Sequence, residues 1–384
     1  MADPSLPYRL RLPGPTAVPE RVRNAQASLI VNHRGPEFAE AATEIAQGLQ
    51  QIIGTKNEIL LFAASGTGMM EASLVNVLGP NDKVLILSNG QFAERFTAIA
   101  GGVGLQADTI DIPWGEDVEI DELTARLGAA DYKAVVAIHN ESSTGTVADL
   151  TKIGAAVRDT PALLIVDSVS GLGGIEMKQD EWGVDVLLSA SQKALMCPPG
   201  LGIASVSNKA WKVIEQDAGR ARFYWDFRTA RDWAAKGQTN FTPPVSLVWA
   251  LREALRMIFE EGPAEVLARH DRLSRALRAG GTALGLPVFT KSPIVSNTVS
   301  VFEMPEGKDG GPVVRHLYER YGTVIAGARN KLDGKVIRFG TMGNLTDADI
   351  IVDLVHLGRT LEDLQVPVSR GDGIAAAEAV LREN

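Results

Sequence analysis

Two stretches in the middle of the chain decide its fold: residues 163–174 read LLIVDSVSGLGG and residues 184–193 read VDVLLSASQK. Each begins with a nearly continuous apolar run and ends in small and polar residues. Uninterrupted runs of Val, Ile and Leu are typical of strands that are buried on both faces, as in a parallel sheet covered by helices. These two stretches therefore predict strands of an α/β fold.

The same theme repeats from about residue 55 to residue 205, where each apolar run is followed by a turn and then by a helical pattern. This alternation predicts a mostly parallel sheet. The expected strands cover residues 59–64, 83–87, 134–138, 163–166, 184–188 and 203–206. The expected helices cover residues 68–78, 92–101, 121–129 and 149–159.

Prolines at positions 13, 15 and 19 predict an extended N-terminal arm over residues 1–20, because proline fixes φ and restricts the residue before it. Near the other end of the large domain, Pro243 and Pro244 precede an amphipathic pattern over residues 245–260. We expect this pattern to run on as a helix toward Arg278, through the Glu-Gly-Pro sequence at 261–263.

We place the domain boundary within this helical pattern. The large domain is expected to span residues 21–255 and a smaller α+β domain to span residues 256–384. The expected strands of the small domain cover residues 298–302 and 335–339, and its expected helices cover residues 311–321 and 346–366. No internal repeat interrupts this organisation.

The composition is that of a soluble globular protein: 384 residues, of which 45% are hydrophobic and 22% charged. The formal net charge of -9 offers no basic field for a phosphate backbone, so nucleic-acid binding is not expected. No apolar run reaches membrane-spanning length, and the N-terminus lacks a signal-peptide pattern. Cys197 is the only cysteine, which excludes an intrachain disulfide and gives no metal-ligand spacing. We therefore expect a cytoplasmic protein with no membrane partner and no metal site.

Ligands of a parallel α/β sheet bind at the carboxyl ends of its strands, so the residues that follow the apolar runs are candidates for a site. Asp167 follows one run and Lys193 follows the next. A lysine among small, apolar and proline residues is not expected on a solvated face, and burial would lower the pKa of its amine and make it nucleophilic. The structural alternative for Asp167 is a carboxylate that caps its own turn.

A third element, Ser65-Gly66-Thr67-Gly68, follows the strand expected at 59–64 and opens a helix. Glycines let backbone amides approach an anion, and the helix dipole adds to the attraction. We call Ser65, Gly66 and Thr67 the phosphate cup. The same residues would also make an ordinary N-capped turn. A phosphate cup, a carboxylate and a lysine at neighbouring strand ends are what a pyridoxal phosphate site requires.

The chain resembles the class V aminotransferases of fold type I, in particular the alanine-glyoxylate and serine-glyoxylate (serine-pyruvate) group. The similarity extends over nearly the whole chain, and the Asp-Ser-Val and Ser-Gln-Lys-Ala blocks are its specific parts. The matching residues are Leu12 to Thr16, His33 to Phe38, Ser65 to Thr67 with Glu71 and Ala72, Asn89 and Gly90, Glu141 to Gly145, Asp167 to Val169 with Gly173 and Gly174, Ser191 to Lys193 with Pro198 to Gly200, Thr242 to Val245, and Lys335 to Arg338. The resemblance implies a large domain with a mostly parallel, seven-stranded type of sheet and a smaller α+β domain.

The resemblance also implies a role for each matching residue. Lys193 would form the Schiff base with pyridoxal 5'-phosphate and transfer the proton, and Asp167 would pair with the pyridinium nitrogen. Val169 and Phe92 would cover the two faces of the ring. The phosphate would be surrounded by Ser65, Gly66, Thr67 and Gln192.

Three further residues would act on the substrate or across subunits. Ser142 would lie near the cofactor oxygen or the substrate carboxylate, and Arg338 would bind that carboxylate with its planar fork of donors. Thr242 would reach the phosphate of a neighbouring subunit, which implies a homodimer with shared active sites. Phe92 replaces the tryptophan of several relatives, and Thr239 stands where some relatives carry a tyrosine that binds the phosphate.

Other interpretations remain open for several of these residues. Arg338 could be a structural ion-pair partner. His139 is expected to be hydrogen-bonded beside the site, while His33 and Arg34 are expected to brace the arm and a dimer interface. The aromatic cluster at residues 223–227 could line the substrate entrance or pack at a subunit interface. Cys197 is expected to be buried and inert.

The function expected from the resemblance is a transaminase that passes the amino group of alanine or serine to glyoxylate or a similar 2-oxo acid by a ping-pong mechanism. The alternative is a relative with another amino donor, namely 2-aminoethylphosphonate, ureidoglycine or pyridoxamine. A cysteine desulfurase is disfavoured because the only cysteine lies four residues after Lys193. A non-catalytic scaffold is disfavoured because both Lys193 and Asp167 are retained.

Overall fold

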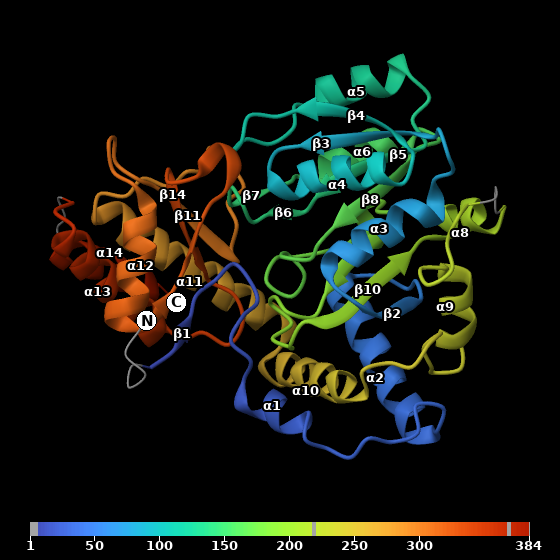
Figure 1. Cartoon of the computed structure of the whole chain (residues 1–384), viewed down its shortest axis with the longest axis horizontal. Coiled ribbons are helices and arrows are strands. Elements are labelled where there is room, and N and C mark those ends of the chain that lie inside the picture. The colour runs from blue at the N-terminus through green and yellow to red at the C-terminus, as the bar shows by residue number, and fades with distance from the viewer. Residues whose placement is uncertain (1–6, 217–219, 367–369, 384) are drawn as a thin grey trace.

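The computed structural model describes residues 7–216, 220–366 and 370–383. Its larger part is built around a seven-stranded sheet (Figure 1). The strand order is β2-β10-β9-β8-β5-β3-β4. The strands are β2 (Ile59–Ala64), β10 (Gly200–Val206), β9 (Val186–Ala190), β8 (Leu163–Asp167), β5 (Ala134–Ile138), β3 (Lys83–Ser88) and β4 (Gln106–Asp111). From β9 to β4 all pairings are parallel, whereas β10 pairs antiparallel with both β9 and β2. The expected α/β fold is confirmed, with β4 as an additional edge strand.

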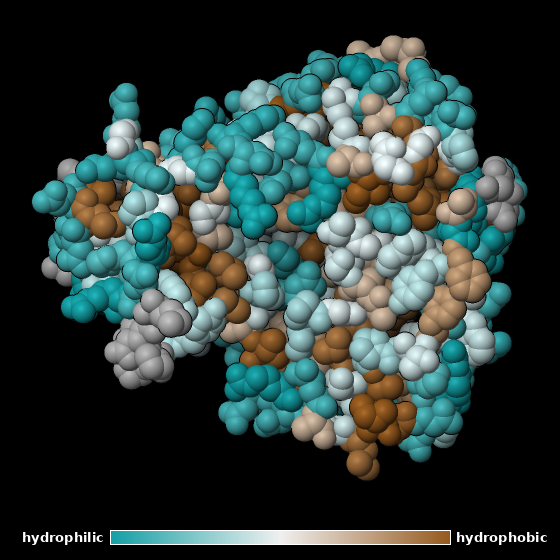
Figure 2. All heavy atoms as spheres, viewed as in Figure 1, coloured by the Kyte–Doolittle hydropathy of each residue, from teal (hydrophilic) through white to brown (hydrophobic). Residues whose placement is uncertain are grey.

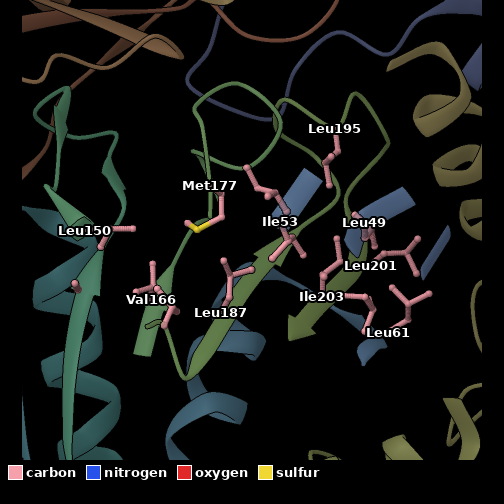
Figure 3. Packing of buried hydrophobic residues seen from close by; sticks show 14 of the residues in the cluster. Leu49, Ile53, Leu61, Leu150, Val166, Met177, Leu187, Leu195, Leu201 and Ile203 are labelled. Atoms are coloured by element: carbon pink, nitrogen blue, oxygen red, sulfur yellow. The ribbon is translucent and has the colours of Figure 1, made fainter. Parts of the chain in front are cut away.

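Alternate residues of each strand enter two different hydrophobic cores. Leu164 and Val166 belong to the core on one face of the sheet, whereas Leu163 and Ile165 belong to the core on the other face. Figure 3 shows the first core, in which Leu49 and Ile53 of α2 (Pro36–Ile53) lie against the strand residues Leu61, Leu187, Leu201 and Ile203. Burial on both faces explains why the strands have uninterrupted apolar sequences.

Helices cover both faces of the sheet. Four of them lie close to the expected ranges, namely α3 (Gly66–Val77), α4 (Gln91–Gly102), α5 (Ile120–Ala129) and α6 (Leu150–Arg158). The helices α7 (Gln179–Trp182), α8 (Asn208–Glu215) and α9 (Phe227–Ala234) were not predicted from the sequence. Ser65 caps α3 by accepting a hydrogen bond from the Gly68 amide at 3.2 Å, and Asp149 caps α6 in the same way. These caps satisfy amides that the helix itself leaves without an acceptor.

A second, smaller unit contains an antiparallel sheet with the order β11-β14-β13. Its strands are β11 (Val299–Glu303), β14 (Val336–Gly340) and β13 (Ala326–Gly327), and its helices are α11 (Pro263–Ala283), α12 (Gly310–Tyr321), α13 (Asp347–Asp363) and α14 (Arg370–Leu381). Its core includes Leu273, Phe302 and Phe339, whereas Val266 still belongs to the core of the large sheet. The change from one core to the other therefore falls within α11.

The helix expected to run on from residue 245 toward Arg278 is two helices. Helix α10 (Val245–Glu261) ends before Gly262, whose φ is 99°, and α11 starts with Pro263 at its first position. The positive φ of Gly262 breaks the helical path, and Pro263 is favourable only at a helix start, where its missing N–H costs nothing.

The N-terminal arm crosses the molecule and packs on the smaller unit. Its strand β1 (Arg9–Leu10) pairs in parallel with β12 (Thr323–Val324). Arg11 is 5% exposed and forms ion pairs with Asp353 and Asp349 of α13, both at 2.6 Å. The arm then leads to α1 (Glu20–Ala25), which contacts α10. Residues 1–6 of the expected arm lie outside the described residues. From residue 7 on, the arm is attached to the small unit through β1 and Arg11 and to the large unit through α1.

The surface is mostly hydrophilic in the view of Figure 2, with hydrophobic residues in several separate places, one of which is at the lower edge near the lower end of α2. The connection between α1 and α2 carries Leu29 and Ile30, which are 86% and 69% exposed. Within the described ranges, no helix has the length and apolar character needed to cross a membrane.

Candidate active site

A cavity of about 260 Å³ lies at the carboxyl edge of the large sheet. Because β2 and β9 are both antiparallel to β10, β2 runs in the same direction as the parallel strands, and its carboxyl end meets theirs. The cavity is lined by Gly14, Pro15, Ser65, Gly66, Thr67, Met70, Phe92, Arg95, Ile138, Asn140, Ser142, Asp167, Val169, Ser170, Gln192, Lys193 and Pro199. The fold therefore brings together nine of the eleven residues expected at the site; Thr242 and Arg338 are outside this lining.

Lys193 follows β9 and is 9% exposed. Its Nζ donates a hydrogen bond to the carbonyl oxygen of Pro13 in the N-terminal arm. Burial lowers the pKa of this amine from 10.5 to about 8, and the opposing charge of Asp167 limits the fall. An amine with such a pKa is partly neutral near physiological pH, which is the form that attacks an aldehyde.

The arm approaches Lys193 closely enough to require glycine at position 14. A Cβ on Gly14 would overlap the Lys193 side chain, and φ of Gly14 is 119°, in the region that favours glycine. The hydroxyl of Thr16 also donates to the carbonyl of Lys193 at 3.0 Å. The Leu12-Pro-Gly-Pro-Thr16 motif therefore covers the lysine directly.

Asp167 ends β8 and is 4% exposed. Its Oδ1 accepts a hydrogen bond from the Val169 amide at 2.8 Å. Burial raises the pKa of this carboxyl to about 7, partly offset by the Val169 hydrogen bond. A buried carboxylate of this kind is stabilised by a cation that enters the cavity, as a protonated ring nitrogen would.

The phosphate cup lies at the N-terminus of α3, where Gly66 and Thr67 are the first helical residues. The first amides of a helix have no acceptor within it and carry the positive end of its dipole. A Cβ on Gly66 would lie 3.0 Å from Cγ2 of Val169, so glycine permits the close approach of these two segments. The cup can therefore bind an anion at the edge of the same cavity.

Phe92 borders the cavity from α4. The start of this helix is fixed by the buried carboxylate of Glu141, to which the sequence assigned no role. Glu141 is fully buried, and its Oε2 accepts hydrogen bonds from the amides of Phe92 and Ala93 at 2.9 and 3.3 Å. Its Oε1 accepts from the amide and hydroxyl of Ser143. Burial raises the pKa of Glu141, and these hydrogen bonds oppose the rise. The position of Glu141 within the Glu141-Ser-Ser-Thr-Gly145 motif was the available sequence signal.

Arg338 on β14 reaches the border of the site from the smaller unit. Its Nε and Nη2 donate to the Gly327 carbonyl at 2.9 and 2.7 Å, and its Nη1 donates to the Ser142 carbonyl at 2.9 Å. These bonds fix the plane of the guanidinium and leave a second N–H on each terminal nitrogen. Two such donors match the oxygens of a carboxylate. Arg338 forms no ion pair with any described residue, so the structure does not support the alternative that it is a structural ion-pair partner.

Two buried polar atoms of the cavity lining lack a partner among the described residues, Oε1 of Gln192 and Oδ1 of Asn140. Buried acceptors of this kind are costly unless a ligand or water supplies a donor. Together with the buried amine, the buried carboxylate and the anion cup, they form a donor and acceptor set that fits pyridoxal phosphate. Lys193 would hold its aldehyde, Asp167 its ring nitrogen and the cup its phosphate.

Thr242 is exposed and lies just before α10, away from the cavity lining. Thr239 is 9% exposed, and its hydroxyl donates to the Phe241 carbonyl at 2.7 Å. In the same region, Arg34 donates to the Thr239 carbonyl at 2.7 Å and lies over the Trp233 ring. Among the described residues, neither Thr239 nor Thr242 lines the cavity that contains the phosphate cup.

The remaining candidates are structural within the described chain. His139 is buried and hydrogen-bonded to the Ser168 hydroxyl at 2.8 Å, and burial lowers its pKa to about 4. Trp225 packs on Gly68 and Phe62 rather than in the cavity. Cys197 is 1% exposed, and burial raises the pKa of its thiol to about 12, which makes it unreactive.

The mostly parallel sheet, the buried lysine and the buried carboxylate at adjacent strand ends define a pyridoxal phosphate-dependent enzyme of fold type I. The model of the aminotransferase class-V family matches residues 20–302, and the chain belongs to this family.

Individual relatives cover almost the full length of the chain. It is 38% identical to the "Soluble hydrogenase, small subunit" of Synechococcus sp. (strain PCC 6716), over 97% of this chain and 98% of the relative. It is 37% identical to the serine–glyoxylate aminotransferase of Methylorubrum extorquens, over 98% and 96% of the two chains. The solved structure of pyridoxamine-pyruvate aminotransferase from Mesorhizobium loti superposes with a TM-score of 0.93 at 28% identity and covers 99% of both chains.

Proposed function

We propose that this class V aminotransferase transfers the amino group of a small amino acid, alanine or serine, to glyoxylate or a similar 2-oxo acid. The observation that carries the proposal is the pairing of Lys193 and Asp167 in one cavity, with the Arg338 guanidinium bonded to the Ser142 carbonyl at its border. The resemblance to serine–glyoxylate aminotransferase supports the choice of substrates.

Bound pyridoxal phosphate supplies an aldehyde that combines with amines and a ring that withdraws electrons from the carbon to be deprotonated. Lys193 would hold the aldehyde and then, once the substrate amine replaces it, carry a proton between substrate and cofactor carbons. The lowered pKa of Lys193 supports this base role at neutral pH. Asp167 would keep the ring nitrogen protonated, and Val169 and Phe92 would hold the ring between them.

The substrate carboxylate would bind to the two remaining terminal N–H groups of Arg338 and near Ser142. The same carboxylate position would serve the amino acid in one half-reaction and the 2-oxo acid in the other, because both bear a carboxylate on the reacting carbon. A ping-pong reaction requires that both substrates bind in turn to one site. The bonds from Arg338 to Gly327 and Ser142 support a fixed orientation of the guanidinium.

The amino donor is tested by a substrate panel. Alanine, serine, 2-aminoethylphosphonate, ureidoglycine and pyridoxamine would each be combined with glyoxylate and with pyruvate, and the new oxo compound and amino acid quantified. We expect the highest kcat/KM for alanine or serine with glyoxylate. A higher kcat/KM for 2-aminoethylphosphonate, ureidoglycine or pyridoxamine would replace the proposed donor with that compound.

We also propose a homodimer in which Thr242 of one subunit contacts the phosphate in the other. The exposure of Thr242 and the exposed apolar residues Leu29, Ile30 and Phe223 support an interface on this side of the large unit. The proposed organisation is an arm over residues 1–20, a large domain over 21–255 and a small domain over 256–384. A cytoplasmic location is proposed from the single, buried free thiol of Cys197.

A further inference from the structure

Arg95 is a cation at the cavity for which the proposed mechanism has no role. It lies on α4, three residues after Phe92, so both side chains point to the same side of the helix. Its Nη1 donates to the Thr67 hydroxyl of the phosphate cup at 3.0 Å. Its guanidinium carbon lies 4.6 Å from the centroid of the Phe92 ring, within the range of a cation–π contact. The stack and the hydrogen bond together hold the guanidinium at the rim of the cup.

The charge of Arg95 is not neutralised by an ion pair with any residue that the structure describes. In the parts of the chain that the structure describes, no carboxylate lies within ion-pair distance of Arg95, and its hydrogen bond goes to a neutral hydroxyl. Its positive charge nevertheless acts inside the cavity, where it lowers the pKa of both Asp167 and Lys193. An unpaired guanidinium over a cup of amides and hydroxyls is suited to an anion.

The cup otherwise lacks charge. Ser65, Gly66 and Thr67 are neutral, and so is Gln192, which also lines the cavity, whereas a phosphate monoester carries nearly two negative charges at neutral pH. The other two cations of the site are already engaged, since Lys193 must take the aldehyde and Arg338 is bonded to Gly327 and Ser142. Thr239, in the position of the tyrosine of some relatives, directs its hydroxyl to the Phe241 carbonyl.

We propose that Arg95 is a ligand of the cofactor phosphate and supplies the charge that the cup lacks. It binds the phosphate with its planar fork while the Phe92 ring, which covers the cofactor, holds the guanidinium in place. Arg95 is thus a positioning residue for the cofactor. This inference rests on pyridoxal phosphate as the cofactor and does not depend on the identity of the amino donor.

The test compares cofactor binding with and without the phosphate group. Apoenzyme would be titrated with pyridoxal phosphate and with pyridoxal, and the visible absorbance of the bound compound would give each Kd. The variants are Arg95→Gln and Arg95→Lys. Arg231→Gln is the matched control, because Arg231 also lies over an aromatic ring, that of Trp211 at 4.0 Å, and pairs with Glu215 away from the cavity.

We expect Arg95→Gln to raise the Kd for pyridoxal phosphate about tenfold to a hundredfold, the range for hydrogen bonds to charged groups, and to leave the Kd for pyridoxal unchanged. The Kd of Arg95→Lys for pyridoxal phosphate should lie between those of the parent and of Arg95→Gln. The Kd of Arg231→Gln should match that of the parent. Inorganic phosphate should raise the Tm of the parent apoenzyme and have less effect on Arg95→Gln.

Two results would overturn the inference: an unchanged Kd for pyridoxal phosphate in Arg95→Gln, or an equal loss of affinity for both compounds, which would assign Arg95 to holding Phe92 alone. A parent enzyme that binds pyridoxal phosphate but transaminates none of the panel would refute the proposed function and leave the inference on Arg95 standing.

Discussion

Replacement of Asp167 by asparagine tests the link between the buried carboxylate and catalysis, because it keeps the shape of the side chain and removes its charge. The Val169 amide, now bonded to Oδ1 at 2.8 Å, can bond equally to the amide oxygen of asparagine. The variant should therefore fold and retain cofactor through Lys193 and the cup. What it loses is the anion opposite the ring nitrogen.

The pKa of Asp167 gives the expected size of the change in apoenzyme stability that the substitution causes. Burial raises it from 3.8 to about 7, and a difference of this size corresponds to about 4 kcal/mol at most. Between pH 4 and pH 7 the folded apoenzyme holds a proton that the unfolded chain has released, so its stability falls as the pH rises through this window. The asparagine side chain of the variant does not titrate, so Asp167→Asn should gain stability relative to the parent over the same window and remain constant relative to it above pH 7.

In the holoenzyme, by contrast, the Asp167→Asn substitution should be unfavourable. A protonated ring nitrogen would pair with the ionised carboxylate, and removal of one partner of a buried charge pair costs about 3–5 kcal/mol. We expect turnover per bound cofactor to fall on the order of a hundredfold to a thousandfold.

The assay combines urea unfolding of apoenzyme at several pH values with turnover of holoenzyme normalised to bound cofactor. Asp185→Asn is the control, because Asp185 is also a buried carboxylate, bonded to the Leu164 amide and the Ser207 hydroxyl outside the cavity. Parent-like turnover in Asp167→Asn would contradict the role of this carboxylate in catalysis. A stability difference between variant and parent that does not change between pH 4 and pH 7 would contradict its raised pKa.

Three further predictions concern the rest of the site. Arg338→Lys keeps the charge and loses the planar fork of donors. The KM for the amino donor and the KM for the oxo acid should therefore rise together by a factor that corresponds to about 1–3 kcal/mol, with the cofactor absorbance unchanged. Steady-state kinetics that match the parent for both substrates would make Arg338 structural. Lys193→Ala and Thr242→Ala subunits, each weakly active, should regain activity when mixed, and no gain after verified subunit exchange would contradict shared sites. Glu141→Gln replaces the charged acceptor of the Phe92 and Ala93 amides, so the free energy of unfolding should fall by about 1–3 kcal/mol, measured by thermal unfolding. An unchanged Tm would contradict the role of Glu141 at the start of α4.

Much of the large unit was predictable because its strands are buried on both faces. All six expected strands are present, and the ends of β8 and β9 bring Asp167 and Lys193 into one cavity as the sequence predicted. The edge strand β4 was missed because its sequence, QADTID, is mostly polar and only partly buried, and pairing with β3 more than apolar burial makes it a strand.

Two features of the site were not predictable from residue patterns. Glu141 belongs to the Glu141-Ser-Ser-Thr-Gly145 motif, but the motif does not say what its carboxylate contacts, and only its burial against the first amides of α4 assigns it a role. Arg95 lies on a helix with mixed polarity, and its approach to Thr67 depends on how α3 and α4 pack. The break at Gly262 was visible as a Gly-Pro pair, but the amphipathic pattern on both sides favoured one helix over two.

The most direct test of the account is the identity of the residue that carries the cofactor. Holoenzyme would be reduced with borohydride, digested and analysed by mass spectrometry, with Lys193→Ala protein as the control. We expect a yellow protein whose pyridoxyl group is found on Lys193, since Lys193 lines the cavity and its pKa is lowered to about 8. A pyridoxyl group on any other lysine, or equal labelling of the Lys193→Ala protein, would contradict it.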